Sequence, residues 1–519
     1  MNVLVLNPPF HARYSRSQRS PAVIKSGVLY YPLWLAYATG VLEQDGRERG
    51  HCYSVRLVDA PAAGYSLPQV LDLVDEQTPR LVVMDTGTPS FFNDSEVAAA
   101  IKDHVPDAFL LLVGPHVTAL PEESLRLCPA SDAVARGEYE YTVRDLARLL
   151  TSEGRSSSGC AGLPCGVLGA VDGLSFRAQD GSVVHNPDRA PIQDLDALPF
   201  VSEVYKRHLQ VTDYFYSIAR YPQVTILTGR GCPHHCSYCL WPQTLTGHRY
   251  RRRSVEDVAR EFAYIERELP QVKEVFVEDD TLTVDRKRCE ALAEALIRQG
   301  NRLPFSANSR ADVSYETLAR LHEAGLRLVC VGFESGDQGV LDAMRKGIRV
   351  EQFYRFREDA RRAKVLVHGC FMAGGPGETR ASLAKTLELA KALDPDTAQF
   401  FPLMVYPGTD AYRWAREGGH LVSEDYREWL TAEGLHRTVL QQPGLSAEDL
   451  ASWCDQARRA FYLRPRYVAA KVGQILRQPA EAGRVLRAGR TFFRHLWGRP
   501  KGARRVGGRL GEAASLLSR

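Results

Sequence analysis

The sequence predicts an α/β protein built from two parallel-sheet domains and a carboxyl-terminal helical region. Its 519 residues are too many for one ordinary hydrophobic core. Short aliphatic runs alternate with amphipathic stretches over residues 1–150 and again over residues 206–430, which is the pattern of strand–helix units. A composition of 44% hydrophobic and 25% charged residues is typical of a globular protein and excludes disordered, collagen-like and coiled-coil chains.

Residues 1–150 predict an open, doubly wound parallel sheet, because five strand-like runs are each followed by an amphipathic stretch. The expected strands are 2–6, 54–59, 80–85, 109–114 and 132–135, and the expected helices are 33–45, 67–77, 93–104, 119–127 and 141–150. Such sheets bind ligands beyond the carboxyl ends of their strands. No G-x-G-x-x-G motif follows the first expected strand, so a dinucleotide is not the expected ligand.

Residues 151–205 are rich in Gly, Pro and Ser and predict a linker with a small hairpin over 173–184. Residues 206–430 then predict six strand–helix units. The expected strands are 223–228, 273–277, 304–308, 327–332, 366–372 and 397–403, and the expected helices are 254–268, 285–299, 314–324, 351–363 and 380–392. Six units are two fewer than in a complete TIM barrel, so we expect a partial (β/α)6 barrel with its active site at the carboxyl ends of the strands.

Residues 431–519 are expected to be helical and to end in a basic tail. From Arg484 to Arg519 there are ten Lys and Arg residues against one acid, Glu512, with aromatic residues interleaved. Such a tail is either solvated or a contact for anionic lipid or nucleic acid. The net charge of the whole chain, +4, does not indicate a nucleic-acid partner. No apolar run is long enough to predict a transmembrane segment.

Three cysteines directly after the first expected barrel strand carry the chemistry. Cys232, Cys236 and Cys239 have the spacing C-x3-C-x2-C on one loop, and clustered thiolates suit zinc or an iron–sulfur cluster. Zinc needs a fourth ligand, from His234, His235 or elsewhere, whereas a [4Fe–4S] cluster on three thiolates keeps one iron open for catalysis. The position at a barrel strand end favours the cluster. An oxygen-labile cluster, and an odd number of cysteines, favour the reducing cytoplasm.

This loop resembles that of the radical S-adenosylmethionine (radical SAM) superfamily, with Tyr238 before the last cysteine, and the resemblance extends over about residues 205–430. Further motifs fall at successive expected strand ends: 278–280, 306–310, 332–335, 374–379 and 405–409. The resemblance implies a [4Fe–4S] cluster on the three cysteines and S-adenosylmethionine on the open iron. The implied S-adenosylmethionine contacts are Tyr238, Glu278, Asp279, Asp280, Arg310, Glu334, Ser335, Gly374, Gly375, Pro376 and Gly377.

Each of these contacts has a plainer interpretation. In the resemblance the acidic residues 278–280 face the methionine amino group and Arg310 faces the carboxylate. The acidic run is otherwise an exposed turn, and residues 374–377 are otherwise a simple strand–helix turn. Arg310 and Glu334 are otherwise a structural ion pair.

The amino-terminal domain resembles the Rossmann-like domain of the cobalamin-binding radical SAM subfamily. The similar segments are 6–9 (LNPP), 30–35 (YYPLWL) and 58–60 (VDA). The D-x-H-x-x-G signature of other cobalamin proteins is absent, so the resemblance implies cobalamin without a histidine on its lower face. The expected cobalamin contacts are Thr88, Ser90, Gly114, Pro115, His116, Gly137 and Glu138. His116 is equally interpretable as a residue that stabilises its loop.

The resemblance implies an enzyme, most simply a methyltransferase that acts on an unactivated carbon through a 5′-deoxyadenosyl radical. A cobalamin-dependent cyclase or rearrangement catalyst is the main alternative, and a non-catalytic cobalamin or metal sensor is a third. A methylthiotransferase would need a second three-cysteine site, which Cys52 and Cys128 do not provide. The implied partners are a small-molecule or lipid-like substrate and a one-electron reductant such as flavodoxin or ferredoxin. The two domains are expected to face each other strand end to strand end.

Overall fold

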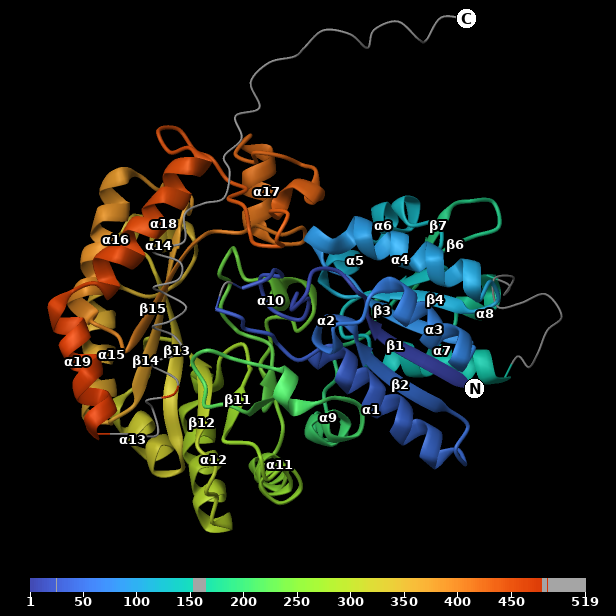
Figure 1. Ribbon diagram of the computed structural model, residues 1–519, viewed down its shortest axis with the longest axis horizontal. Helices are drawn as coiled ribbons and strands as arrows, with labels where there is room; N and C mark the ends of the chain where they lie inside the picture. Colours follow the sequence, from blue (N-terminus) through green and yellow to red (C-terminus); the bar gives the residue numbers. More distant parts are fainter. Residues whose placement is uncertain (25, 153–164, 478–482, 484–519) are drawn as a thin grey trace, which may run out of the picture.

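The structure, a computed structural model, describes residues 1–24, 26–152, 165–477 and 483. The basic tail over 484–519 lies outside the described residues, so its expected lipid contact stays a prediction. Two α/β units lie side by side, one sheet on the right and one on the left of Figure 1, with the carboxyl-terminal helices along the outer side of the left-hand sheet. Within the part of the chain that is described, no helix is both long and apolar enough to cross a membrane.

The amino-terminal sheet has seven strands in the order β2-β1-β3-β4-β5-β6-β7. Its first five strands are parallel, as predicted, and β6 and β7 add to the edge in antiparallel orientation. The bounds are β1 Asn2–Asn7, β2 Ser54–Asp59, β3 Leu81–Asp85, β4 Phe109–Val113, β5 Ala133–Ala135, β6 Leu174–Arg177 and β7 Val183–His185. The hairpin expected within the linker therefore exists, but it extends the first sheet. The pairing of β6 with β5 is short and joins segments that are distant in the sequence, so local sequence patterns do not reveal it.

Helices cover both faces of this sheet (Figure 1), as a doubly wound fold requires. They are α1 Leu33–Glu48, α2 Ala60–Ala63, α3 Leu67–Gln77, α4 Phe91–His104, α5 Pro115–Ala119, α6 Pro121–Leu127 and α7 Glu140–Ser152, followed by α8 Cys165–Leu168 and α9 Val201–His208. The strands are apolar on both faces: Val3 and Val5 pack in one core, and Leu4 and Leu6 in another. This two-sided burial explains the unbroken aliphatic runs of the sequence.

The second unit contains six parallel strands in the order β15-β14-β13-β12-β11-β8, with β8 and β15 at the two edges of an open barrel. The bounds are β8 Gln223–Ile226, β11 Glu274–Val277, β12 Phe305–Ser309, β13 Leu326–Glu334, β14 Leu366–Ala373 and β15 Thr397–Pro402. The surrounding helices are α11 Val255–Glu268, α12 Arg286–Gln299, α13 Tyr315–Glu323, α14 Gln338–Ala343, α15 Val350–Arg362 and α16 Arg380–Leu393. The strand order follows the chain order, as the partial barrel predicted.

The residues that cap these helices explain where they begin. Ser254, Asp285 and Ser314 stand just before α11, α12 and α13, and each side chain accepts a hydrogen bond from a backbone N–H of the first turn. The sequence placed the start of each helix at the cap itself. Short α14 was not predicted, because six residues are too few for a visible helical period.

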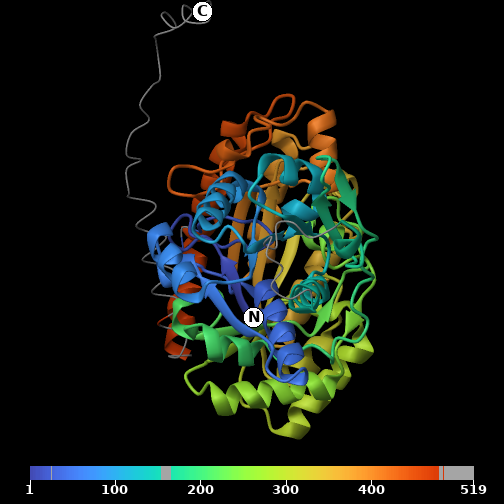
Figure 2. The same ribbon diagram turned by 90° about the vertical axis from the view of Figure 1, so that its right-hand side faces the viewer.

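The carboxyl-terminal region closes one side of the barrel. After α17 (Asp410–Glu417), a stretch of turns and isolated bridges precedes α18 (Ala447–Tyr462) and α19 (Pro465–Arg477). Figure 2, turned by 90°, shows the amino-terminal unit in front of the barrel strands. The junction is aromatic: Tyr31 stacks on Tyr205 and Tyr214, with ring centroids 4.2 and 3.9 Å apart.

Candidate active site at the barrel mouth

The three cysteines lie on the loop that follows β8 at the carboxyl end of the barrel sheet. A short ribbon of β9 (Gly229–Arg230) and β10 (Arg251–Arg252) brackets the loop. Cys236 is buried, whereas Cys232 and Cys239 are partly exposed. Burial raises the pKa of Cys232 to about 11 and that of Cys239 further. Burial therefore favours the protonated thiol at Cys232 and Cys239, and a metal centre bound there would displace these protons.

The side chain of Gln243, on α10 (Leu240–Thr244), fixes the backbone of this loop. Its amide nitrogen donates to the carbonyl oxygens of Cys236, Ser237 and Cys239 at 3.3, 3.2 and 2.8 Å. Its amide oxygen accepts from the backbone N–H of Asp410 at 2.9 Å, which ties the loop to α17. Sequence reasoning missed Gln243, because its local pattern is that of any surface glutamine.

The sulfur atoms of the loop are spaced too widely for one ion. Over the described ranges, a single group of three His, Cys or carboxylate side chains has ligand atoms all within 4.8 Å of one another, and it contains none of Cys232, Cys236 and Cys239. A zinc ion needs its ligands gathered around one point, whereas a four-iron cluster takes each thiolate on a different iron. The donor set and its spacing therefore fit the iron–sulfur interpretation better than zinc.

The acidic run 278–280 follows β11 at the neighbouring strand end, and Glu278 and Asp279 are fully buried. Asp279 accepts bonds from the backbone N–H and the hydroxyl of Thr228, both at 2.6 Å, and so braces β8 against β11. Asp280 accepts from the backbone N–H of Gly231 in the cysteine loop at 3.1 Å. Glu278 Oε2 and Asp280 Oδ1 are buried without a hydrogen-bond partner. Unsatisfied carboxylate oxygens at this position suit an ammonium group and are not an exposed turn.

Arg19, from the segment between β1 and α1, reaches these carboxylates from the other unit. Its guanidinium contacts the Glu278 carboxylate, lies 3.6 Å from Asp280 Oδ1 and donates to the backbone oxygen of Asp279 at 3.2 Å. The guanidinium carbon also lies 4.1 Å from the centroid of the Trp241 ring. No local pattern in the sequence indicates Arg19, since its partners lie about 260 residues further along the chain.

Glu334 ends β13 in the left-handed region, with φ +64°. A β carbon on Gly332 would overlap the Glu334 carboxylate, so a larger residue there would displace the Glu334 side chain from its present position. Glu334 Oε1 accepts from Lys346 Nζ and from the Tyr238 hydroxyl, both at 3.0 Å, and Oε2 is buried without a hydrogen-bond partner. The ion pair of Glu334 is therefore with Lys346 rather than with Arg310.

Arg310 lies on the same edge of the barrel but is held by other groups. Its Nε is 3.1 Å from Asp312, and Nη2 donates to the backbone oxygen of Lys346 at 3.0 Å. Ser335 is buried, and its hydroxyl lies 3.2 Å from that of Thr386 on α16. Of the predicted residues, Arg310 is thus near the cysteine loop, and Ser335 faces the outer helices.

The glycine-rich turn after β14 packs closely against neighbouring elements. A β carbon on Gly375 would overlap Met344, and one on Gly374 would touch Leu450 of α18. The backbone oxygens of Gly374 and Gly375 accept from the Gln442 side chain at 2.9 and 3.0 Å. Pro376 is half-buried and Gly377 is exposed. Close packing explains the first two glycines without a ligand.

Five of the residues expected to contact cobalamin meet beyond β3 and β4. Thr88 and Ser90 form a 3-10 turn after β3, and Gly114 and Pro115 lead into α5. The His116 ring bonds to the Thr88 hydroxyl at 3.1 Å, is buried, and has no hydrogen-bond partner at Nε2. Burial lowers the pKa of His116 to about 3, so the ring is neutral. A buried orphan nitrogen at a strand-end edge fits a site shaped for a polar cofactor.

The other two expected residues, Gly137 and Glu138, lie where the two units meet. The backbone N–H of Gly137 donates to Thr118 at 3.1 Å. Both carboxylate oxygens of Glu138 accept from Arg251 at 2.7 Å, and Arg230 lies 3.5 Å away. Glu138 therefore joins the strand ends of the first sheet to the ribbon that brackets the cysteine loop, in the arrangement predicted for the two domains.

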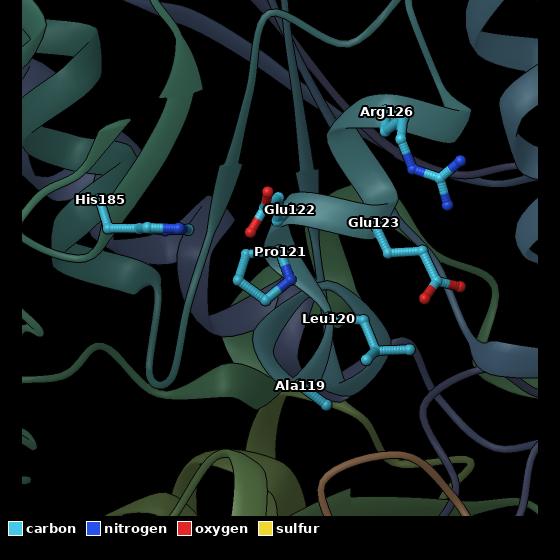
Figure 3. Close-up of a pocket in the computed structure, with 7 residues that line it drawn as sticks. All are labelled: Ala119, Leu120, Pro121, Glu122, Glu123, Arg126 and His185. Carbon is cyan, nitrogen blue, oxygen red and sulfur yellow. The ribbon is translucent and has the colours of Figure 1, made fainter. Parts of the chain in front are cut away.

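A shallow surface depression of about 400 Å³ lies elsewhere on the amino-terminal unit (Figure 3). It is lined by Ala119 and Leu120, by Pro121, Glu122, Glu123 and Arg126 of α6, and by His185 of β7. None of the predicted site residues lines it. The depression is therefore separate from the candidate site at the barrel mouth.

The fold and the site define a radical SAM enzyme with an added ligand-binding sheet. Residues 226–390 match the family model of the radical SAM superfamily, and residues 19–147 match that of the B12 binding domain. The chain therefore contains both a radical SAM domain and a B12 binding domain.

Relatives share most of the chain. An uncharacterized methyltransferase of Pyrococcus horikoshii is 29% identical, over 90% of this chain and 93% of its own length. The anaerobic magnesium-protoporphyrin IX monomethyl ester cyclase of Rubrivivax gelatinosus is 27% identical, over 80% and 70%. Among solved structures, the radical S-adenosylmethionine methyltransferase TsrM of Kitasatospora setae has a TM-score of 0.65 at 19% identity, and 90% of each chain is covered. That likeness confirms the predicted fold.

Proposed function

We propose that this protein is a cobalamin-dependent radical SAM methyltransferase that acts on an unactivated carbon. One observation carries the proposal. The loop of the three thiols is bonded through Gly231 to Asp280, in an acidic run with buried carboxylate oxygens that lack hydrogen-bond partners, and Glu138 docks the strand ends of a B12-binding sheet onto this barrel mouth. We assign cobalamin binding to residues 1–150, with the 174–185 hairpin as an extension of that sheet, and radical chemistry to residues 206–430. When bound, the cluster and S-adenosylmethionine supply a 5′-deoxyadenosyl radical, and cobalamin supplies a transferable methyl group.

The protein's own residues hold these groups in place. Cys232, Cys236 and Cys239 ligate the cluster, on a loop that Gln243 keeps rigid. Glu278 and Asp280 accept the methionine ammonium through the oxygens that lack partners, and Glu334, Tyr238 and Arg310 border the same space. Asp279, bonded to Thr228, fixes the strand ends.

The cobalamin contacts are assigned to the strand-end cluster of Thr88, Ser90, Gly114, Pro115 and His116. Because burial keeps His116 neutral between Phe91 and Tyr426, at centroid distances of 4.6 and 5.4 Å, it orders the loop. Gly137 borders the same edge. Glu138 is not assigned as a cobalamin contact. Its ion pair with Arg251 instead holds the two units together.

The barrel interior supports a small, largely apolar substrate. Phe276 and Leu328 face inward and pack with Ile218, and Tyr216 covers Phe276 edge-on at 4.5 Å. The same floor contains the buried ion pair of Glu274 with Arg327, whose guanidinium donates to the backbone oxygen of Ile218. The charges of this pair compensate each other, and the apolar side chains beside it favour the hydrocarbon portion of a lipid-like or aromatic molecule. A one-electron reductant of the flavodoxin or ferredoxin class is required to start each turnover.

The test is an anaerobic incubation of the reconstituted protein with S-adenosylmethionine labelled in its methyl group. We expect iron and cobalt to be retained together, 5′-deoxyadenosine to be released, and label to enter the product. A Cys232/Cys236/Cys239→Ala variant should lose iron and keep cobalt, whereas Cys289→Ala, a buried thiol on α12, should keep both. Release of 5′-deoxyadenosine with unlabelled product would instead establish the cyclase alternative. The similarity to the Rubrivivax enzyme supports this alternative.

A further inference from the structure

A second group of potential metal ligands lies inside the barrel, apart from the cysteine loop. Cys330 is on β13, and His368 and Cys370 are on β14. The ligand atoms of the three side chains all lie within 4.8 Å of one another, and the two sulfur atoms are 3.8 Å apart. No other group of described residues meets this spacing.

These side chains face the barrel lumen. Along β13, Val329 and Val331 are buried in the core beneath the helices, so Cys330 between them points to the opposite face. There it packs with Leu328 and Phe276 on the floor described above. Cys330 and Cys370 are partly exposed, which on this concave face leaves them accessible from inside the barrel.

We propose that Cys330, His368 and Cys370 bind one divalent ion of the Zn²⁺ class, with a fourth coordination position open to the lumen. In a tetrahedral site with Zn–S bonds of about 2.3 Å, two sulfur atoms are about 3.8 Å apart, which is the separation found here. Two thiolates neutralise the ion's double charge, so the complex adds no net charge to the buried interior of the barrel. Three protein ligands with one open position are typical of zinc that binds a substrate or water.

A neighbouring contact already orients the imidazole. The hydroxyl of Thr397 on β15 lies 2.7 Å from Nδ1 of His368. Hydrogen bonds of this kind to a ligating histidine fix its ring and tautomer. The ligands thus come from two adjacent strands and the support from a third, which is a rigid arrangement.

Strand register argues against a disulfide between the two cysteines. Cys330 is paired with His368, and Cys370 with Gly332, so the two cysteines are offset by two residues on adjacent strands. With a rise of about 3.3 Å per residue and about 4.8 Å between strands, their Cα atoms are about 8 Å apart. A disulfide needs Cα atoms within about 7 Å, whereas metal coordination bridges the longer span.

The site lies beneath the place assigned to S-adenosylmethionine. Cys330 precedes Glu334 by four residues along the same strand, which is about 13 Å towards the amino end of the barrel. An ion there would coordinate an oxygen or nitrogen of a molecule in the lumen. This inference does not depend on the proposed methyl transfer.

The experiment is a titration of the cobalamin-free full chain with Co²⁺, in a Cys232/Cys236/Cys239→Ala background so that the cluster loop cannot bind. We expect one Co²⁺ per chain, with sulfur-to-cobalt charge-transfer absorption and tetrahedral ligand-field bands, and displacement by one equivalent of Zn²⁺. Adding Cys330→Ala or Cys370→Ala should abolish the charge-transfer band or weaken binding at least 100-fold. Adding Cys289→Ala, the matched buried thiol, should leave both unchanged.

Circular dichroism identifies the variants that are folded. A second titration adds Zn²⁺ to the reconstituted wild-type chain, and zinc per chain is measured while iron per chain stays constant. It repeats the test without the background substitutions. The proposal is overturned if folded protein shows no thiolate–cobalt absorption, if that absorption survives Cys330→Ala, or if peptide mapping of unreduced anaerobic protein finds Cys330 joined to Cys370. Activity is not a readout, so failure here and failure of the proposed function are separate results.

Discussion

Gly231, directly before the first cluster cysteine, is the position where a single methyl group should cost the protein its cluster. Its φ of +87° is a conformation that costs a residue with a β carbon about 1 kcal/mol. The β carbon would also overlap the carbonyl oxygen of Arg249 and lie 3.1 Å from that of Gly247. Both obstacles are backbone atoms, which cannot rotate away, so overpacking adds about 1–3 kcal/mol. Gly231→Ala should therefore destabilise the protein by about 2–4 kcal/mol in total.

The same loop offers a matched control in Gly247, which has φ +73° and nothing within 4 Å of an added β carbon. Gly247→Ala should cost only the conformational component, about 1 kcal/mol. Urea unfolding of both variants gives the two free energies, and iron per chain after anaerobic reconstitution reports the loop geometry. We expect Gly231→Ala to lose most of its iron while Gly247→Ala keeps it. Equal iron content and free energies within about 0.5 kcal/mol would refute the argument from backbone overlap.

Two further predictions concern charge. Arg251→Met removes the closer of the two arginine partners of buried Glu138 and leaves only Arg230, 3.5 Å away. This change should lower the free energy of unfolding by up to about 3–5 kcal/mol. Arg260→Met breaks a pair whose arginine is exposed and should cost below about 1 kcal/mol; equal losses in urea unfolding would contradict this. For His116, the folded pKa of about 3 lies below the unfolded value of 6.5, so the unfolded state binds more protons between these values and stability should fall as pH drops below about 6.5. His116→Gln should flatten that dependence and His104→Gln, at an exposed site, should not; an unchanged profile in His116→Gln would count against it.

The fold was predictable because its elements carry local signals. All eleven parallel strands of the two sheets start and end within two residues of their expected bounds, since each is an aliphatic run bounded by polar or glycine-rich loops. Helix starts were equally visible from capping residues such as Ser254 and Ser314. The addition of β6 and β7 to the first sheet was not predictable, because the pairing of β6 with β5 is decided by contacts between segments distant in sequence.

The candidate site divides in the same way. The three cysteines and the acidic run were visible because each is a short motif at a strand end. Lys346 and Gln243 were not, because their importance comes only from what the fold places beside them. Likewise the alternative interpretation paired Glu334 with Arg310, whereas the structure pairs Glu334 with Lys346. A motif reveals functional side chains that are close together in the sequence. Only the structure reveals the oppositely charged residues that pair with them.

Arg19 gives the last of these predictions, because it competes for the carboxylates assigned to S-adenosylmethionine. Its guanidinium contacts Glu278 and lies 3.6 Å from Asp280, so a ligand ammonium must share or displace it. Removing the guanidinium leaves the two carboxylates without their countercharge and raises their attraction for a cation by about 1–2 kcal/mol. Arg19→Met should therefore lower the Kd of S-adenosylmethionine about tenfold, measured by equilibrium dialysis of the reconstituted protein. Arg13→Met, in the same segment but bonded only to backbone oxygens, should leave it unchanged. A weaker affinity in Arg19→Met would show instead that Arg19 shapes the site for the ligand, and the carboxylates would then need another cation to explain their burial.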